Sequence, residues 1–145
     1  MSHSHLHVAF GRIQEQASTS HKQSTPSRSR GAPIEPFFSN QSMRRARELV
    51  SARARRGNFF NSSLFSDPAW DILLELYVAE TEGKRLCVSA IGVMAAIPAT
   101  TVLRWLAALE QEGLVMRAGD PFDARRVFVS LTDAALNALN AYFQS

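Results

Sequence analysis

Residues 88–132 read VSAIGVMAAIPATTVLRWLAALEQEGLVMRAGDPFDARRVFVSLT, and this stretch decides the fold. A short helix is predicted over residues 89–96. Ile97-Pro98 interrupts it, because the proline ring clashes with a continuing helix. A second, amphipathic helix is predicted over about residues 99–112, and Gly113 ends it. Two β-rich runs follow and flank a polar loop. The order is therefore helix, turn, helix and a two-stranded wing.

The helix predicted over residues 99–112 has two faces. Its core positions, three and four residues apart, are Val102, Trp105, Leu106 and Leu109. We interpret Trp105 as a core residue rather than a base-stacking one. The opposite face carries Thr100, Arg104, Ala107 and Gln111. Small side chains would let the N-terminal half of the helix approach base edges in a DNA major groove. The contacts predicted there are Ala99, Thr100, Thr101 and Arg104. Arg104 would read a guanine or hold a phosphate, and ordinary solvation is the alternative.

The two β-rich runs are predicted as strands over residues 114–117 and 126–131, since apolar side chains alternate in the second run with the period of a half-buried strand. Gly119-Asp120-Pro121 is a turn signal in the intervening polar loop. We expect Asp123 to orient the guanidinium of Arg125 through a charged hydrogen bond, which would prepare it for a narrow DNA groove. A plain surface ion pair is the alternative.

A further core helix is predicted upstream of this stretch. Asp67 is its expected N-cap, Pro68 occupies the first helical position, and the helix ends near residues 82–83. Its wide apolar face consists of Ala69, Trp70, Leu73, Leu74, Tyr77 and Val78. Residues 86–88 are expected to form a short strand that joins the wing sheet, and Ser89 to cap the helix that follows.

Residues 41–60 form an Arg-rich segment with six arginines against Glu48, whereas residues 61–145 carry more acidic than basic side chains. Such a concentration of positive charge favours a polyanionic partner. A helix is predicted over residues 41–56, with Ser42 as its N-cap and Gly57-Asn58 at its end. Its apolar stripe consists of Met43, Ala46, Leu49 and Val50.

Two interpretations of the Arg-rich helix remain open, and both can hold at once. Its apolar stripe packs on the domain or on a second subunit, or its arginines contact DNA phosphates. Because the stripe has no obvious partner within a compact domain, we predict that it is the dimerisation element. A single winged helix reads only a few base pairs, and a two-fold dimer would read two half-sites.

Residues 1–40 are rich in Ser, Thr, Gln, His and Pro and are predicted to be a disordered tail. All of the histidines lie there: His3, His5, His7 and His21. Alternating histidines can bind metal ions, but no cysteine or acidic partner lies nearby, so we predict a solvated tail and no metal site. Phe37 and Phe38 are candidates for docking on the domain.

The composition excludes several classes of protein. Cys87 is the only cysteine, so an intramolecular disulfide and a CxxC zinc finger are excluded, and a reducing compartment is indicated. No apolar run approaches the ~18–20 residues that span a bilayer, and the N-terminus lacks the apolar segment of a signal peptide. We expect a cytoplasmic bacterial protein, nucleoid-associated when bound to DNA, with no membrane partner and no cofactor.

Residues 67–135 resemble the MarR-type winged-helix transcriptional regulators. The resemblance rests on DPAWDILLELY, IPATTVLRWLAALEQEGLV and DPFDARRVFVSLTDAA. The matching family features are Thr101 early in the recognition helix, Leu109-Glu110 with Gly113-Leu114-Val115 at its exit, Asp123 and Arg125 in the wing, and a closing Leu131-Thr132. This resemblance covers about half the chain and implies a dimer that binds a near-palindromic DNA site and controls transcription.

The chain also departs from the family pattern. Ala124 stands where the family often has arginine, and Ala135 where it often has glycine. The family usually builds its dimer from long C-terminal helices, whereas residues 133–143 supply one short helix at most. Dimerisation would then use residues 41–60 together with this short helix. The family's small-molecule pocket usually lies against the long helices, so we do not predict a small-molecule effector site.

The predicted fold class is mainly α with a small β wing: a winged helix-turn-helix over residues 61–145, preceded by the Arg-rich helix of residues 41–60 and the tail of residues 1–40. We predict a homodimeric, sequence-specific DNA-binding regulator, and the alternative is a winged-helix module that binds another protein. The predicted DNA contacts are Ala99, Thr100, Thr101, Arg104, Arg117, Asp123, Arg125 and Arg126. Catalysis is not expected, because residues 61–145 contain no histidine and Cys87 has no visible base.

Overall fold

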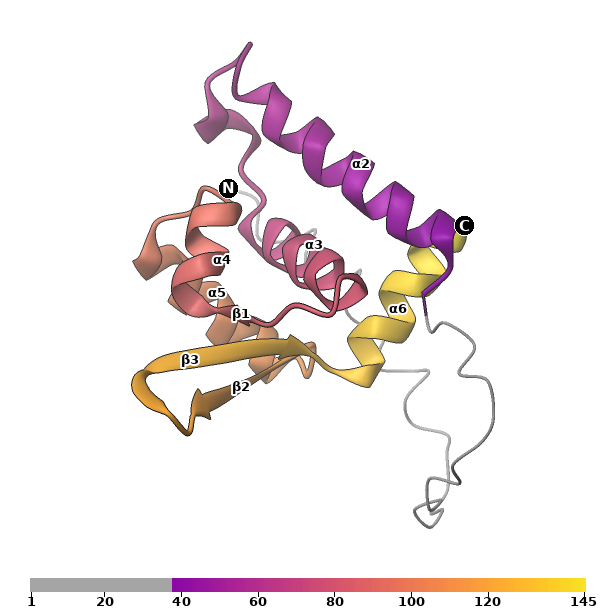
Figure 1. Ribbon diagram of the computed structural model, residues 1–145. Coiled ribbons are helices and arrows are strands. Elements are labelled where there is room, and N and C mark those ends of the chain that lie inside the picture. Colours follow the sequence, from indigo (N-terminus) through magenta and orange to yellow (C-terminus); the bar gives the residue numbers. More distant parts are fainter. Residues whose placement is uncertain (1–37) are drawn as a thin grey trace, which may run out of the picture. The chain divides into compact units, whose positions relative to one another are not determined.

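The computed structural model describes residues 38–145, which belong to one compact unit over Pro36–Ser145. It is mainly helical with a three-stranded antiparallel sheet, so the predicted fold class is confirmed (Figure 1). The elements are α2 (Asn40–Arg56), η1 (Ser62–Phe65), α3 (Pro68–Thr81), β1 (Leu86–Cys87), α4 (Val88–Met94), α5 (Ala99–Gln111), β2 (Val115–Asp120), β3 (Asp123–Leu131) and α6 (Asp133–Gln144). The four histidines and Phe37 lie outside the described residues.

α3 is the centre of the core and contacts α2, α4, α5 and β3. As predicted, Asp67 caps it, since its carboxylate accepts a hydrogen bond from the backbone N–H of Trp70, and Pro68 begins it. Burial extends beyond the predicted face, and the fully or nearly fully buried side chains of α3 include Ile72, Leu74, Leu76 and Tyr77. The ring of Phe38 meets Tyr77 edge to face at 5.3 Å, so this part of the expected aromatic docking is confirmed.

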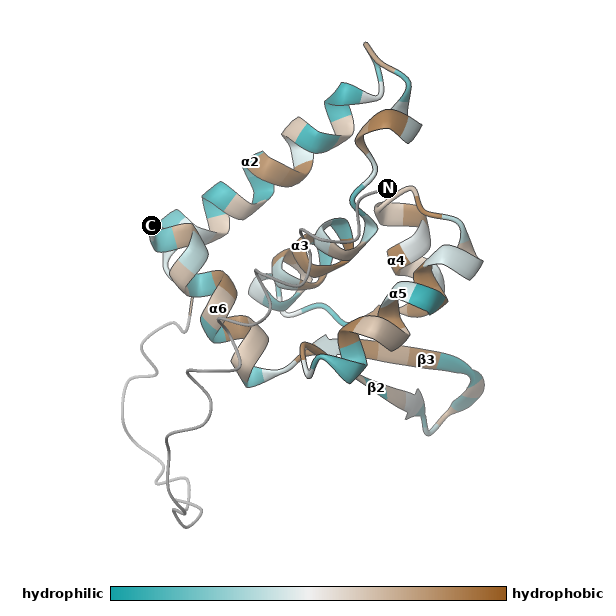
Figure 2. Ribbon diagram, turned by 180° about the vertical axis from the view of Figure 1, so that it is seen from behind, coloured by the Kyte–Doolittle hydropathy of each residue, from teal (hydrophilic) through white to brown (hydrophobic). Residues whose placement is uncertain are grey.

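α2 lies along α3 and α6, on the opposite side of α3 from the β2–β3 hairpin (Figures 1 and 2). Its N-cap is Ser39, whose hydroxyl accepts from the backbone N–H of Ser42 at 3.0 Å, so the prediction of Ser42 as the cap is wrong. Ser42 instead lies fully buried within the helix, as does Ala46. The apolar stripe therefore has a partner inside the chain, contrary to the expectation that it lacks one.

The helix-turn-helix consists of α4 and α5. α4 begins at Val88 after Cys87, without a side-chain cap, so the predicted cap at Ser89 is wrong. The break between the helices places Ala96 at a φ of 53°, and α5 follows Pro98 as predicted. Gly92 allows the close approach of α4 to this turn, because a Cβ there would lie 3.2 Å from the carbonyl oxygen of Ile97. A side chain at Gly92 would push the two helices apart.

The sheet has the strand order β1-β3-β2, so the short strand predicted near residues 86–88 does join the wing. The hairpin strands are longer than predicted and pair as far as Asp120 and Asp123. The polar loop expected over residues 120–126 is wrong, since only Pro121 and Phe122 connect the strands. Backbone pairing explains the difference, because it continues through polar residues once the strands are in register.

Thr132 connects the base of the wing to the helices on either side. Its hydroxyl donates to the carbonyl oxygen of Gly113 at 2.7 Å and accepts from the backbone N–H of Ala135 at 3.2 Å, which caps α6. Gly113 has a φ of 71°, a left-handed conformation that glycine adopts at little cost, and it ends α5 as predicted. Of the helices in the described part of the chain, none alone is long and apolar enough to cross a membrane, and α4 and α5 pass that test only together, as a pair bent by 112°.

Candidate nucleic-acid interface

α5 turns its core face inward and leaves a short polar face exposed. Val102, Leu106 and Leu109 are buried, as predicted, and Trp105 is half-buried. Ala99, Thr100 and Arg104 are exposed, whereas Thr101 is half-buried and points partly into the fold. Within residues 38–145 the guanidinium of Arg104 has no hydrogen-bonding or ionic partner. Three of the four predicted groove residues of α5 are therefore accessible on one surface.

The wing presents its arginines from β3. Arg125 and Arg126 are exposed, and in the described part of the chain the guanidinium of Arg125 forms no ion pair. The expectation that Asp123 holds that guanidinium is wrong: the carboxylate of Asp123 accepts instead from the backbone N–H of Arg125 at 3.0 Å. The side chain of Arg126 lies 3.8 Å from the carboxylate of Asp120. Asp123 thus shapes the hairpin and leaves Arg125 accessible.

Arg117, unlike Arg125, forms an ion pair within the described residues. Its Nε and Nη2 both donate to one carboxylate oxygen of Glu110, at 3.0 and 2.5 Å. These hydrogen bonds raise the pKa of Arg117 and lower the pKa of Glu110. The pair joins β2 to α5 and balances the charge of Arg117, which weakens Arg117 as a phosphate contact. Its predicted role in DNA binding stays a prediction.

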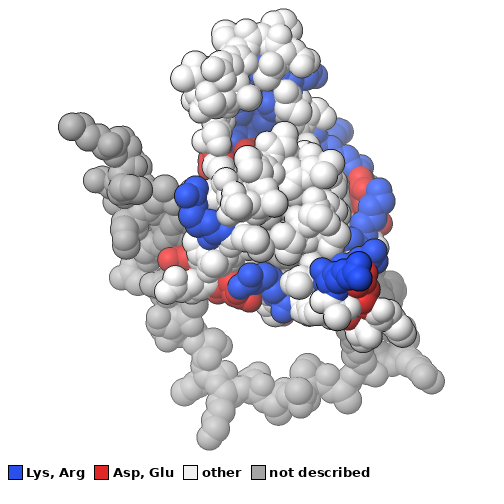
Figure 3. Space-filling model, turned by 90° about the vertical axis from the view of Figure 1, so that its left-hand side faces the viewer, with Lys and Arg blue, Asp and Glu red and all other residues white. Residues whose placement is uncertain are grey.

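A groove of about 700 Å³ lies between the helix-turn-helix and the wing. Ala99 and Leu103 of α5 line one wall, Val93 of α4 lines its end, and Arg125 and Arg126 line the side formed by β3. Val93 is 82% exposed and Leu103 is 49% exposed, although both are large apolar residues. Figure 3, which faces the side of the molecule with the hairpin tip and α4, shows Lys and Arg side chains around a broad uncharged surface. The groove is therefore lined mainly by apolar side chains from the helix-turn-helix and, on the side of β3, by Arg125 and Arg126 together with Asp123.

Sequence reasoning missed the exposed apolar residues of this surface. Leu103 stands one position before Arg104 and between the two faces of α5, so the helical spacing assigned it to neither. Val93 belongs to a run of small and apolar residues that gave α4 no polar face. The signal that could have located them is the shortness of α4, since a helix of two turns cannot bury all of its sides.

Cys87 also lines the groove, but it has no catalytic base. Its thiol lies 3.2 Å from the hydroxyl of Ser89, and this hydrogen bond, with one from the backbone of Ala90, lowers the pKa of the Cys87 thiol. A serine hydroxyl stabilises a thiolate but does not accept its proton at neutral pH. Among the described residues, none at this position could therefore act as a general base for the Cys87 thiol.

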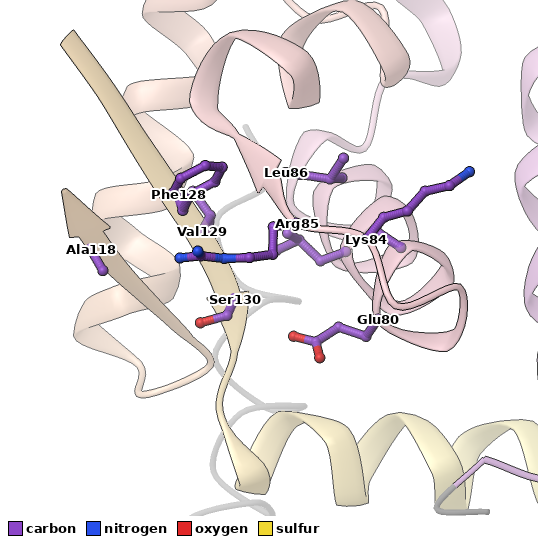
Figure 4. Close-up of a pocket in the computed structure, with 10 residues that line it drawn as sticks. Glu80, Lys84, Arg85, Leu86, Ala118, Phe128, Val129 and Ser130 are labelled. Carbon is purple, nitrogen blue, oxygen red and sulfur yellow. The ribbon is translucent and has the colours of Figure 1, made fainter. Parts of the chain in front are cut away.

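A smaller cavity of about 260 Å³ lies between α3 and the sheet (Figure 4). Three polar side chains that line it form contacts within the fold. Glu80 accepts from the backbone N–H of Leu131 at 3.2 Å, and Lys84 pairs with Glu82 at 2.8 Å. Arg85 extends across the ring of Phe128, with its guanidinium carbon 4.0 Å from the ring centre. These contacts join β1, β3 and α3, so we interpret this cavity as structural.

Comparisons with known proteins agree with the fold. A family model described as a winged helix DNA-binding domain matches residues 69–135. The structure of S. aureus MepR in its DNA-binding conformation is 19% identical, covers 70% of this chain and 69% of its own, and has a TM-score of 0.50. At this identity the likeness establishes the fold alone.

Two further solved structures are similar. The S. aureus MepR–DNA complex is 20% identical, with 70% of this chain and 75% of that chain covered and a TM-score of 0.49. A probable transcriptional regulator from Pseudomonas aeruginosa is 28% identical, with 68% and 69% covered and a TM-score of 0.45. No curated protein matches the chain. Residues 69–135 therefore match a winged helix DNA-binding domain, the fold that the sequence resemblance predicted.

Proposed function

We propose that this chain is a homodimeric, sequence-specific transcriptional regulator that binds double-stranded DNA with α5 in the major groove and the wing on the adjacent backbone and minor groove. One observation carries the proposal: Ala99 and Leu103 of α5 form one wall of the groove, and the unpaired Arg125 stands on the other. A sugar–phosphate ridge separates a major groove from the next minor groove, and the apolar side chains and arginines that line the groove fit its sugars and phosphates.

The start of α5 supports a phosphate contact. No side chain caps its N-terminus, and no acidic residue lies in its first turn. The first backbone N–H groups of a helix lack internal acceptors and carry the positive end of the helix dipole, so they attract phosphate. Thr100 and Arg104 follow on the exposed face and would reach base edges, with Arg104 suited to guanine. Ala99, Thr101, Arg117, Asp123 and Arg126 complete the proposed contact set as backbone or positioning residues.

The proposed dimer uses the outer edge of α2 together with α6. Ala46 is fully buried inside one chain, so it does not face a second subunit, and Met43, Leu49 and Val50 remain as candidates because they are half-buried. Leu49 and Ala52 border a shallow groove against Tyr142 of α6, which is 55% exposed. Light scattering should show a dimer for the full chain and a monomer for Leu49→Glu. A dimeric Leu49→Glu would place the interface elsewhere.

Selection of bound duplexes from a random pool, followed by fluorescence anisotropy of the selected sequence, tests the whole proposal. We expect a near-palindromic site and an affinity that falls steeply with salt. The double variant Arg104→Ala, Arg125→Ala should lose the preference for that site. Arg55→Ala is the matched control, because Arg55 is also exposed and has no partner among the described residues, but lies on α2.

The same experiment separates the alternative function. A pool that shows no enrichment, with no salt-dependent binding of any duplex, would overturn the proposal. The apolar surface around Val93 and Leu103 would then favour a winged-helix module that binds another protein.

A further inference from the structure

The tip of the wing carries an aromatic ring where a charged side chain would be better solvated. Phe122 is 96% exposed, and it is followed by Val93 and Phe59 at 82% and 79% among the large apolar side chains of residues 38–145. It stands in the two-residue connection between β2 and β3, at the tip of a hairpin that runs beneath α4 and α5 (Figure 1). A phenylalanine in this position buries almost no surface against residues 38–145, so the described part of the fold does not explain its presence.

The backbone under Phe122 is held firmly. The carboxylate of Asp120 accepts from the backbone N–H of Phe122 at 2.9 Å, and the carboxylate of Asp123 accepts from the backbone N–H of Arg125 at 3.0 Å. Pro121 fixes its own φ, which reduces the freedom of the connection further. The carboxylate of Asp120 also lies 3.8 Å from the guanidinium of Arg126. The side chains of Asp120 and Asp123 therefore both contact the hairpin itself, and the ring of Phe122 is left exposed at the tip.

We propose that Phe122 is a wedge that enters the DNA minor groove and inserts between two base pairs, unstacking them partly and bending the duplex. This inference rests on the proposed function. Apolar side chains such as Phe act in this way in minor-groove proteins, where they kink DNA toward the major groove. Because pyrimidine–purine steps unstack most easily, the wedge selects a flexible step such as TA at a fixed distance from the bases that α5 reads.

The dimensions of the hairpin support a wedge by one side chain. The minor groove is about 6 Å wide and 7.5 Å deep, whereas paired strands with their side chains are wider than that, so only the tip reaches the floor. A strand rises about 3.3 Å per residue, which places Arg125 roughly 10 Å behind Phe122, at the height of the phosphates that border the groove. The ring and the guanidinium thus contact the same groove at different depths.

The test measures DNA geometry as well as affinity. Fluorescence energy transfer between dyes at the two ends of the selected duplex reports its bend, and 2-aminopurine placed in turn at each adenine beside the half-site reports unstacking. With the full-length chain we expect a bent duplex and one bright 2-aminopurine position. Phe122→Ala should abolish both signals and weaken binding by roughly 5- to 100-fold, the loss typical of one base–aromatic stack.

Three comparisons make the outcome specific. Phe122→Leu should keep most of the bend, because leucine also acts as a wedge. Phe59→Ala removes another exposed aromatic ring, far from the wing in sequence and just after α2, and should change neither signal. The salt dependence should be the same for Phe122→Ala and the unchanged chain, since no phosphate contact is lost. An unbent duplex with the unchanged chain, or an equal bend with Phe122→Ala, would overturn the wedge, whereas failure of the unchanged chain to bind any duplex would overturn the proposed function instead.

Discussion

The arginines of α2 and those of the wing differ in what surrounds them. α2 carries six arginines, and five have a partner in the same chain. These contacts are Arg44 with Glu48, Arg45 with the carbonyl oxygen of Phe143, Arg47 with Glu82, Arg53 with Asp71, and Arg56 over the ring of Phe65. Arg55 alone has none among the described residues. In the wing, by contrast, the guanidinium of Arg125 has no partner within residues 38–145, and Arg126 has a long contact to Asp120.

The density of positive charge along the sequence therefore does not indicate which arginines are available to bind DNA. The Arg-rich segment has the highest positive charge along the chain, yet its arginines mainly join α2 to α3 and to the C-terminal end of α6. A carbonyl oxygen at a helix C-terminus lacks an internal donor, and Arg45 supplies one to Phe143 at 2.7 Å. The wing has fewer arginines but leaves one unpaired beside a groove. The comparison predicts that α2 arginines act on stability and wing arginines on DNA affinity.

The largest effect is expected for the most enclosed arginine of α2. Arg53 and Asp71 are 2.5 Å apart, with side chains 16% and 23% exposed. Arg53→Ala leaves Asp71 unpaired in a partly desolvated place, so urea denaturation should show a loss of roughly 2–3 kcal/mol of stability, somewhat below the cost of breaking a fully buried pair. Arg44→Ala, which breaks an exposed pair, should cost at most about 0.5 kcal/mol. Equal losses for the two variants would contradict the division of roles within α2.

The second prediction concerns the wing. Arg125→Ala should weaken binding of the selected duplex by about 1–3 kcal/mol and lower the log–log salt slope by roughly 0.9, with the melting temperature unchanged. Arg55→Ala removes the same charge from α2 and should leave both quantities nearly unchanged. Anisotropy titrations at several salt concentrations measure both. If Arg55→Ala weakened binding as much as Arg125→Ala, the arginines of α2 would also be DNA contacts.

A smaller effect is expected for Arg104, and it distinguishes two kinds of contact. If Arg104 reads a base edge, Arg104→Ala should reduce the ratio of specific to random-duplex affinity by about 1 kcal/mol or more. A uniform loss on all sequences would assign it to a phosphate. Competition titrations with the selected duplex and with random DNA separate these results.

The smallest predicted effect concerns Glu75, an acidic residue of α3 that has no arginine partner among the described residues. Desolvation, with the nearby charges of Asp71 and Glu82, raises the pKa of Glu75 from its ordinary 4.5. The folded chain therefore holds the Glu75 proton more tightly than the unfolded chain, so stability falls as pH rises from 4.5 through the raised pKa. Glu75→Gln should add roughly 0.5–2 kcal/mol at pH 7, as stabilising changes commonly do, and less at pH 4. A gain that is equal at both pH values would show that ionisation is not the cause.

Features that depend on neighbouring residues were predictable from the sequence. The break at Pro98, the exit at Gly113 and the cap at Asp67 follow from backbone chemistry within a few residues, and the structure contains all three. The core face of α5 followed from its helical period. These features were sufficient to predict the winged helix.

Features that depend on partners from other elements were not predictable. The pair of Arg117 with Glu110 joins a strand to a helix, and neither residue's spacing indicates the other. The burial of Ala46 depends on α3 and α6, which a helical stripe does not reveal. Asp123 and Arg125 are near in sequence, but the carboxylate of Asp123 accepts from the backbone N–H of Arg125, because β3 begins at Asp123, within the segment predicted as a loop.

The hydrogen bonds of Thr132, which connect the base of the wing to the ends of α5 and α6, have a mechanical consequence for the wing. β3 spans Asp123–Leu131, which at about 3.3 Å per residue gives it a length of roughly 26 Å. A tilt of about 5° at its base moves the far end by roughly 2 Å, enough to break or form a hydrogen bond. Thr132 directly follows β3 and is the N-cap of α6, so a tilt of β3 that accompanies a movement of α6 displaces the tip of the hairpin more than its base.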